Sequence, residues 1–287
     1  MRPADVAEVE RLTAHTYLDV DRRTRLPGTP EPALRSVEQA AAWRRHAEHV
    51  LRHDGPGCWV ADGPAGLVGV TMSMRRDTMW LLAAYAVLPA AQGQGLGTRL
   101  LDTALEYGAG CLRGMVVSSP DPRAARRYRS ARFDLHPTMH GLGEVRREAL
   151  PVPEDVREAT AADIDLADSV DRRTRGSGHG IDHPLLAATM PMLVVDRPGG
   201  QGYCYLRSPG TVYLLAATNE RTAARLLWAA LGSGLAGQPV RVPHVTAANQ
   251  WALDVIVAAG LDVQTQGYLA LRGMRPPAPY LPSGHFL

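Results

Sequence analysis

The stretch Met79–Gly110, MWLLAAYAVLPAAQGQGLGTRLLDTALEYGAG, decides how the rest of the chain is interpreted. An apolar, strand-like segment runs as far as Val87, and a turn containing Pro89 follows it. The glycine-rich loop of residues 92–98, QGQGLGT, then leads directly into a helical pattern of leucines at positions 96, 100, 101 and 105. Unpaired N–H groups and the positive end of the helix dipole meet where a helix begins. The stretch therefore predicts an anion-binding loop.

Three other interpretations of this loop are weaker. Its glycines could form only a tight turn, but three alternating glycines at a helix start, where glycine is costly, indicate close approach of another group to the backbone. A dinucleotide-binding fingerprint would need glycine where Thr98 stands. All 31 basic residues are arginine, so the chain has no lysine for a Walker A loop or a Schiff base.

The composition describes a globular protein with one or two domains. The chain has 287 residues, 45% of them hydrophobic, and a net charge of +2, which does not suggest a nucleic-acid partner. Cys58, Cys111 and Cys204 form no CxxC pair, so we expect no metal site and a reducing, cytoplasmic compartment. No apolar run is long enough for a membrane span, and we expect a monomer or homodimer.

The order of elements restarts near residue 150. The first part reads as two helices, three strands, a helix, a strand, a helix and a strand, and Pro151-Val152-Pro153 resembles a linker. Six residues then recur, because Val20–Arg25 and Val170–Arg175 both read VDRRTR at the end of a candidate first helix. We therefore predict an internal duplication with domains 1–149 and 150–287. Expected elements include helices Ser36–Leu51 and Asp121–Ser130 and strands Cys58–Ala61, Gly66–Met74, Arg113–Ser118 and Val156–Thr160.

Two motifs resemble those of one family. The segment Tyr85–Gly97 resembles the acetyl-CoA signature of the GNAT superfamily of N-acetyltransferases, Q/R-x-x-G-x-G/A after a strand ending in V-x-P. The family's second motif, N-x-x-A-x-x-x-Y-x-x-x-G-F, resembles Asp121, Ala124, Tyr128 and Phe133. The chain departs from that motif twice, with Asp121 in place of asparagine and arginine 132 in place of glycine.

The resemblance implies a fold and a site. The fold class would be α/β, as an α+β mixed sheet: two tandem domains, each with a mostly antiparallel sheet flanked by helices. Acetyl-CoA would be the acyl donor, and Tyr128 would protonate the departing thiolate, since an ordinary tyrosine keeps its proton at pH 7. Backbone groups of strand residues 85–87 would pair with the pantetheine arm, and loop amides would hold the pyrophosphate. The implied cofactor-binding residues are Tyr85, Ala86, Val87, Gln92, Gly93, Gln94, Gly95, Leu96, Gly97, Thr98 and Asp121.

The second half keeps one motif and lacks the other. Asn249, Ala252 and Gly260 match the second motif, but Ile256 stands at the tyrosine position. Arg221 stands where Gly95 would align, so the phosphate loop is absent. The resemblance therefore implies a degenerate second domain that completes the acceptor pocket or holds the fold together.

The function implied is N-acetyl transfer to an amine of a small molecule or peptide by direct attack on the thioester. A non-catalytic acyl-CoA-binding or regulatory module is the alternative. The base is not assigned, because Asp77, Asp134, His136 and His140 each fit a surface or turn role equally well. Arg22–Arg25 and Arg172–Arg175 could bind an acidic acceptor or the cofactor's phosphates, but solvated helix ends are their default role.

Overall fold

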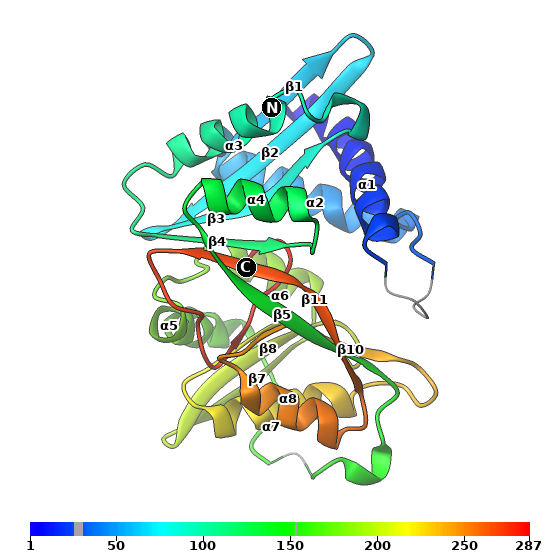
Figure 1. Ribbon diagram of the computed structural model, residues 1–287. Helices are drawn as coiled ribbons and strands as arrows, with labels where there is room; N and C mark the ends of the chain where they lie inside the picture. The colour runs from blue at the N-terminus through cyan, green and yellow to red at the C-terminus, as the bar shows by residue number, and fades with distance from the viewer. Residues whose placement is uncertain (26–30, 153) are drawn as a thin grey trace.

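The structure is a computed structural model that describes residues 1–25, 31–152 and 154–287. Its described strands form one mixed, mostly antiparallel sheet in the order β1-β2-β3-β4-β11-β5-β10-β9-β8-β7-β6, with β12 paired to β9 (Figure 1). Up to residue 149 the elements are α1 (Val6–Arg23), α2 (Val37–His53), β1 (Cys58–Gly63), β2 (Gly66–Arg76), β3 (Met79–Val87), α3 (Leu96–Tyr107), β4 (Arg113–Ser118), α4 (Pro122–Ser130) and β5 (Asp134–Gly143). Beyond it lie β6 (Arg157–Glu158), α5 (Ile164–Thr174), α6 (Asp182–Thr189), β7 (Met192–Arg197), β8 (Gly200–Ser208), β9 (Thr211–Ala217), α7 (Glu220–Gly232), β10 (Val240–Thr246), α8 (Gln250–Ala258), β11 (Asp262–Arg272) and β12 (Tyr280–Leu281).

The predicted fold class and the predicted order of elements in the first half are confirmed. Local signals explain the agreement: Ser36 caps α2 by accepting a hydrogen bond from the backbone N–H of Gln39, as its residue type predicts. The strand expected over Val156–Thr160 is shorter, since only Arg157 and Glu158 pair with β7. The domain boundary near residue 150 stays a prediction.

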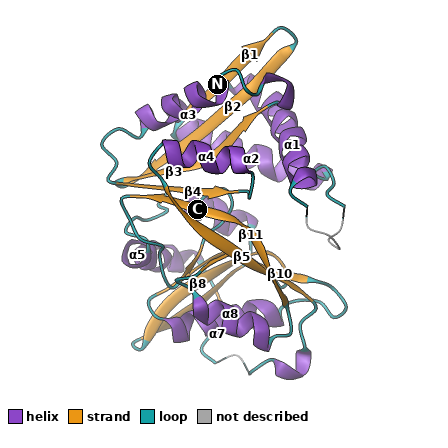
Figure 2. Cartoon of the chain, viewed as in Figure 1, coloured by secondary structure: helices purple, strands orange, loops and turns teal. Residues whose placement is uncertain are grey.

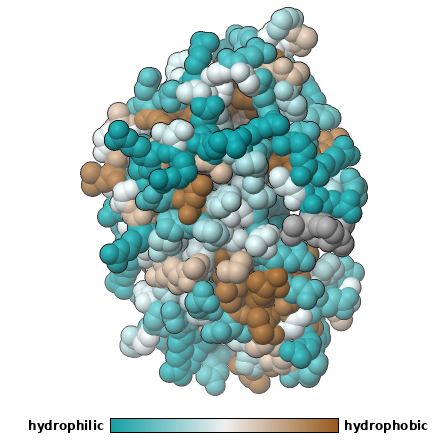
Figure 3. Space-filling model, in the orientation of Figure 1, coloured by the Kyte–Doolittle hydropathy of each residue, from teal (hydrophilic) through white to brown (hydrophobic). Residues whose placement is uncertain are grey.

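Helices cover both faces of the sheet (Figures 1 and 2). One apolar core joins residues of α1 and α2 to residues of α5 and α6, so it extends across both halves of the sequence. On the opposite face, α3 and α4 pack over a core that contains Trp80, Tyr128 and Phe133, and α7 and α8 pack over another. Exposed apolar side chains gather over α8 in the view of Figure 3. Val257 of this helix is 60% exposed.

The last long strand of each half pairs with the other half. β11 lies between β4 and β5 and is antiparallel to both, and β5 pairs with β10. β5 and β11 are separated by more than a hundred residues of sequence, and Figure 1 shows them running side by side through the middle of the molecule. The two halves therefore share one continuous sheet through exchanged strands.

Two splayed strand pairs result from this topology. β3 and β4 run parallel and pair only where Met79, Trp80 and Leu81 face β4; beyond Leu81 they diverge. The equivalent strands of the second half, β9 and β10, pair only between Thr211 and Arg241. In the second half β12 pairs with β9, whereas in the first half the splay forms part of a cavity.

Candidate active site

A cavity of about 680 Å³ lies at the splay between β3 and β4. The glycine-rich loop after β3 and helix α4 line one side of this cavity. Residues of α1 and two residues of the C-terminal segment, Gly284 and His285, also line it. The lining includes the predicted residues Tyr85, Ala86, Val87, Gln92, Gly93, Gly95, Gly97, Asp121 and Tyr128, together with Thr16, Tyr17, Asp21, Gly284 and His285. Motifs far apart in sequence are thus brought to one cavity. Gln94, Leu96 and Thr98 belong to the loop and first helical turn but are not part of the lining.

Protein side chains already contact the open edge of β3. The Tyr85 N–H donates to the hydroxyl of Tyr17 (3.3 Å), and the Val87 carbonyl accepts from Nε2 of Gln92 (2.9 Å). Residues alternate in direction along a strand, so the backbone groups of the intervening Ala86 face β2, with which it pairs through Val70. A ligand strand along this edge would therefore meet Tyr85 and Val87, and would replace the hydroxyl of Tyr17.

Glycine is required at the loop for two reasons. Gly93 and Gly95 have φ values of 81° and 79°, the left-handed region that other residues rarely adopt. Gly97 instead needs space, because a Cβ there would lie 2.6 Å from Oη of Tyr85, which donates to the Gly97 carbonyl. Gly95 is the N-cap of α3 and provides no capping side chain, so the start of the helix directs uncapped N–H groups toward this side of the cavity. This geometry favours an anion.

Helix α4 adds positive charge to the loop. Nη1 of Arg123 donates to Oε1 of Gln92, and Nη1 of Arg127 donates to Oγ1 of Thr98. Asp121 is the N-cap of α4: its Oδ1 accepts from the backbone N–H of Arg123 (2.8 Å), and its Oδ2 accepts from Arg23 (3.2 Å). Asp121, which stands in place of the motif's asparagine, is thus already hydrogen-bonded to other groups of the protein. Arg123 and Arg127 of α4 add positive charge beside the loop.

Three tyrosines line the cavity, and their hydroxyls differ in availability. Oη of Tyr85 donates to Gly97 (2.8 Å), and Oη of Tyr17 accepts from the Tyr85 N–H. Tyr128 contacts the rings of Tyr85 and Phe133, and its hydroxyl makes no hydrogen bond to another described residue. Burial raises the pKa of Tyr128, followed by the nearby hydroxyls of Tyr85 and Tyr17, so this phenol keeps its proton well above neutral pH.

None of the base candidates named from the sequence lines the cavity. Asp77 accepts from the backbone N–H of Gly178, and Asp134 pairs with Arg129. His136 and His140 lie on β5. The titratable groups that do line it, apart from the residues above, include Asp21 and His285. Their positions depend on the packing of α1 and of the C-terminal segment against β3, which no local sequence pattern encodes.

The splay of the second half is filled by the chain itself. Tyr280 and Leu281 of β12 pair with Ala216 and Leu215 of β9. The backbone oxygen of Leu287 accepts from Nη1 of Arg175 (2.5 Å), Oη of Tyr280 (2.6 Å) and Nε2 of His179 (3.0 Å). The default expectation of solvated helix ends is wrong for Arg175, which is 2% exposed.

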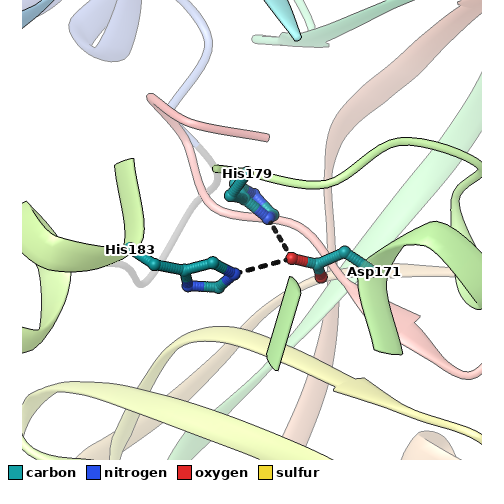
Figure 4. A group of neighbouring side chains, drawn as sticks. All are labelled: Asp171, His179 and His183. Atoms are coloured by element: carbon teal, nitrogen blue, oxygen red, sulfur yellow. Dashed lines mark hydrogen bonds and ion pairs between the residues drawn. The ribbon is translucent and has the colours of Figure 1, made fainter. Parts of the chain in front are cut away.

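Asp171, His179 and His183 form a buried cluster (Figure 4), and His179 links it to the backbone oxygen of Leu287. Oδ2 of Asp171 lies 2.6 Å from Nδ1 of His179 and 2.9 Å from Nε2 of His183. Neighbouring ligands of a tetrahedral zinc ion with bonds of about 2.0–2.1 Å are roughly 3.3 Å apart. The shorter separations are those of hydrogen bonds, and the cation Arg175 is close by, so the cluster has the geometry of a structural network.

Comparison with known proteins agrees with the geometry. Residues 21–133 match the sequence model of the acetyltransferase (GNAT) family. A proposed acetyltransferase from Pyrococcus horikoshii is 17% identical, with a TM-score of 0.73 over 100% of this chain and 93% of that one. A GCN5-related N-acetyltransferase from Sphaerobacter thermophilus is 16% identical (TM-score 0.60; 96% and 95% covered), and a tandem GNAT protein from the clavulanic acid biosynthesis pathway is 15% identical (TM-score 0.53; 93% and 96% covered).

No curated protein matches the chain significantly. Among the described residues, no helix combines the length and the apolar composition that crossing a membrane requires. The family match covers the strand, the glycine loop and the tyrosine helix that form the cavity, and the structural neighbours share the fold across both halves. Residues 21–133 therefore belong to the acetyltransferase (GNAT) family, and the whole chain shares its fold with the structural neighbours.

Proposed function

We propose that the protein transfers an acetyl group from acetyl-CoA to an amine of a small-molecule or peptide acceptor, by direct attack of the amine. The observation that carries this proposal is the position of the free Tyr128 hydroxyl in the same cavity as the left-handed glycine loop. The loop and the uncapped start of α3 suit a pyrophosphate, and Arg123 and Arg127 add charge beside it.

The chain's own residues divide the work as follows. Tyr85 and Val87 offer backbone groups on the splayed edge of β3, where an extended pantetheine arm would form hydrogen bonds in place of those from Tyr17 and Gln92. Bound acetyl-CoA would supply the thioester. As the amine nitrogen bonds to the acyl carbon and the carbon–sulfur bond breaks, Tyr128 donates its phenolic proton to the departing thiolate. Its raised pKa keeps that proton in place until the thiolate forms.

The test is the Tyr128→Phe variant, with Tyr107→Phe as a matched control that removes a hydroxyl outside the cavity. Thiol release from acetyl-CoA is measured against a broad panel of amines, and cofactor affinity is measured by calorimetry. We expect Tyr128→Phe to lower kcat about 10²–10⁴-fold with cofactor affinity retained. The Tyr107→Phe variant should keep the wild-type rate.

Three results would contradict this assignment. Full activity of Tyr128→Phe would exclude Tyr128 as the acid. Loss of turnover in Tyr17→Phe alone would transfer the role to the hydroxyl that contacts the Tyr85 N–H. Tight acyl-CoA binding by the wild-type protein without thiol release to any amine would favour the non-catalytic module.

A further inference from the structure

We infer that His285, delivered by the C-terminal segment of the second half, accepts the proton of the attacking amine in the cavity of the first half. This inference rests on the proposed acyl transfer. His285 and Tyr128 line the same cavity although they are separated by more than half of the chain. The base candidates named from the sequence, Asp77, Asp134, His136 and His140, do not line that cavity, and Asp21 is the carboxylate of the first half that lines it beside Asp121.

The segment that carries His285 is held on both sides of the ring. Before it, Tyr280 and Leu281 pair with β9, and after it, the Leu287 oxygen accepts three hydrogen bonds from Arg175, Tyr280 and His179. Oγ of Ser283 accepts from the backbone N–H groups of Phe286 and Leu287, both at 3.0 Å, which closes the turn around position 285. The ring is therefore positioned by fixed backbone on each side.

Neighbouring groups set the protonation state of the His285 ring. The ring lies beside the backbone of Ala83, the bulged residue of β3, and this backbone group favours a proton on the ring. A donor on one nitrogen leaves a lone pair on the other. The groups that face it are His46 of α2, whose ring centroid is 5.6 Å away, Arg207 of β8 and Arg35 before α2. Burial, followed by these groups, holds the pKa of His285 below its usual range, so the ring is neutral at pH 7 and an imidazolium formed there passes its proton on quickly.

A second polar group points to an acceptor in the same region. Thr16 of α1 lines the cavity and is 4% exposed, and its Oγ1 has no hydrogen-bond partner among the described residues. Buried hydroxyls are normally paired, so an unpaired one in a cavity wall indicates a place where a ligand completes the bonding. Thr16 is therefore suited to hold a polar group of the acceptor near His285.

The transfer step balances with His285 and Tyr128, and water then restores their protonation states. The amine nitrogen forms a bond to the acyl carbon and gives one proton to the free ring nitrogen of His285, while the thiolate takes one proton from Tyr128. The imidazolium of His285 then loses its proton and the phenolate of Tyr128 regains one, through water in the cavity or by exchange with solvent. The protein returns to its starting state with amide and free thiol as products.

The experiment compares His285→Gln and His285→Ala with His15→Ala, an exposed histidine of α1 outside the cavity. Acetyl transfer is measured with whichever amine the wild-type protein acetylates, with KM for that amine and kcat determined separately. Glutamine keeps hydrogen-bonding capacity but takes no proton. We expect kcat to fall about 10²-fold or more in both His285 variants, with acetyl-CoA affinity unchanged and with His15→Ala at the wild-type rate. Added imidazole should restore part of kcat in His285→Ala only.

The outcomes separate this inference from the proposed function. If the wild-type protein transfers no acyl group to any amine, the proposed function fails. If the wild-type protein transfers acetyl and His285→Gln retains its kcat, His285 does not take the proton and the inference fails. Circular dichroism and cofactor affinity verify that each variant is folded. A rise in KM alone, without a change in kcat or rescue by imidazole, would also overturn the assignment, because it would indicate a role in binding only.

Discussion

Replacement of Gly97 by alanine tests the packing that places the glycine-rich loop over β3. The new Cβ would lie 2.6 Å from Oη of Tyr85, whereas the next atoms, Cζ of Tyr85 and Cγ2 of Val87, are 3.7 and 3.8 Å away. Overpacking of this kind costs about 1–3 kcal/mol, and the higher helix propensity of alanine offsets roughly 0.5–1 kcal/mol. We therefore expect Gly97→Ala to lower the free energy of unfolding by about 1–2 kcal/mol.

The second variant, Tyr85→Phe, removes the one atom that clashes. Alone it loses the hydrogen bond to the Gly97 carbonyl, which costs about 0.5–1.5 kcal/mol. In the double variant the nearest atom to the new Cβ is Cζ at 3.7 Å, an ordinary contact, so the alanine penalty should vanish. Urea unfolding of all four proteins at 25 °C gives the coupling energy, which we expect to be about 1–2 kcal/mol. Additive effects within about 0.5 kcal/mol would refute the proposed contact.

Three further predictions concern stability. Gly267→Ala places a Cβ against the carbonyl oxygen of Ser118, a backbone atom of β4, and should lower the free energy of unfolding by about 3 kcal/mol. Gly55→Ala is the control, because a Cβ at Gly55 would have no atom within 4 Å. Equal urea midpoints for the two variants would contradict the pairing of β11 with β4. Although burial opposes ionisation, hydrogen bonds from His49 and Arg76 lower the pKa of Asp182 to about 2, so its contribution of about 2 kcal/mol is present above pH 4 and lost as pH falls toward 2. Asp182→Asn should flatten acid unfolding in that window, and an unchanged slope would count against the pairing. Burial, then the charges of Arg207, Arg45 and His49, lowers the pKa of His46 to about 4, so the unfolded state takes up the proton first and stability falls between about pH 6.5 and 4. His46→Phe should remove up to about 3 kcal/mol of that loss, and identical pH profiles by thermal unfolding would show that folding does not lower the pKa of His46.

Local patterns in the sequence predicted the elements around the site. The leucine spacing of α3, the capping serine of α2 and the alternating glycines each act over a few residues, so each can be interpreted without knowledge of the fold. The cavity then followed from the resemblance of two motifs, and the structure brings both motifs to one place. The roles of the site residues remain predictions.

Contacts between distant segments could not be predicted in the same way. The pairing of β11 with β4 and β5 depends on which edges remain open once both halves have formed, and strand periodicity does not specify a partner. Arg175 holds the same position in the repeated sequence VDRRTR as Arg25. Arg175 is nevertheless buried, because it donates a hydrogen bond to the Leu287 oxygen. His285 reaches the cavity for the same reason, since only the docked C-terminal segment fixes its position.

The exchanged strands also constrain the time course of synthesis. Until residue 272 leaves the ribosome, β11 is incomplete, and the edges of β4 and β5 that it covers have no permanent partner. These edges would be exposed for more than a hundred residues of elongation, during which they could pair with another nascent chain. The first half is thus translated early but completes its sheet only after β11 has been made.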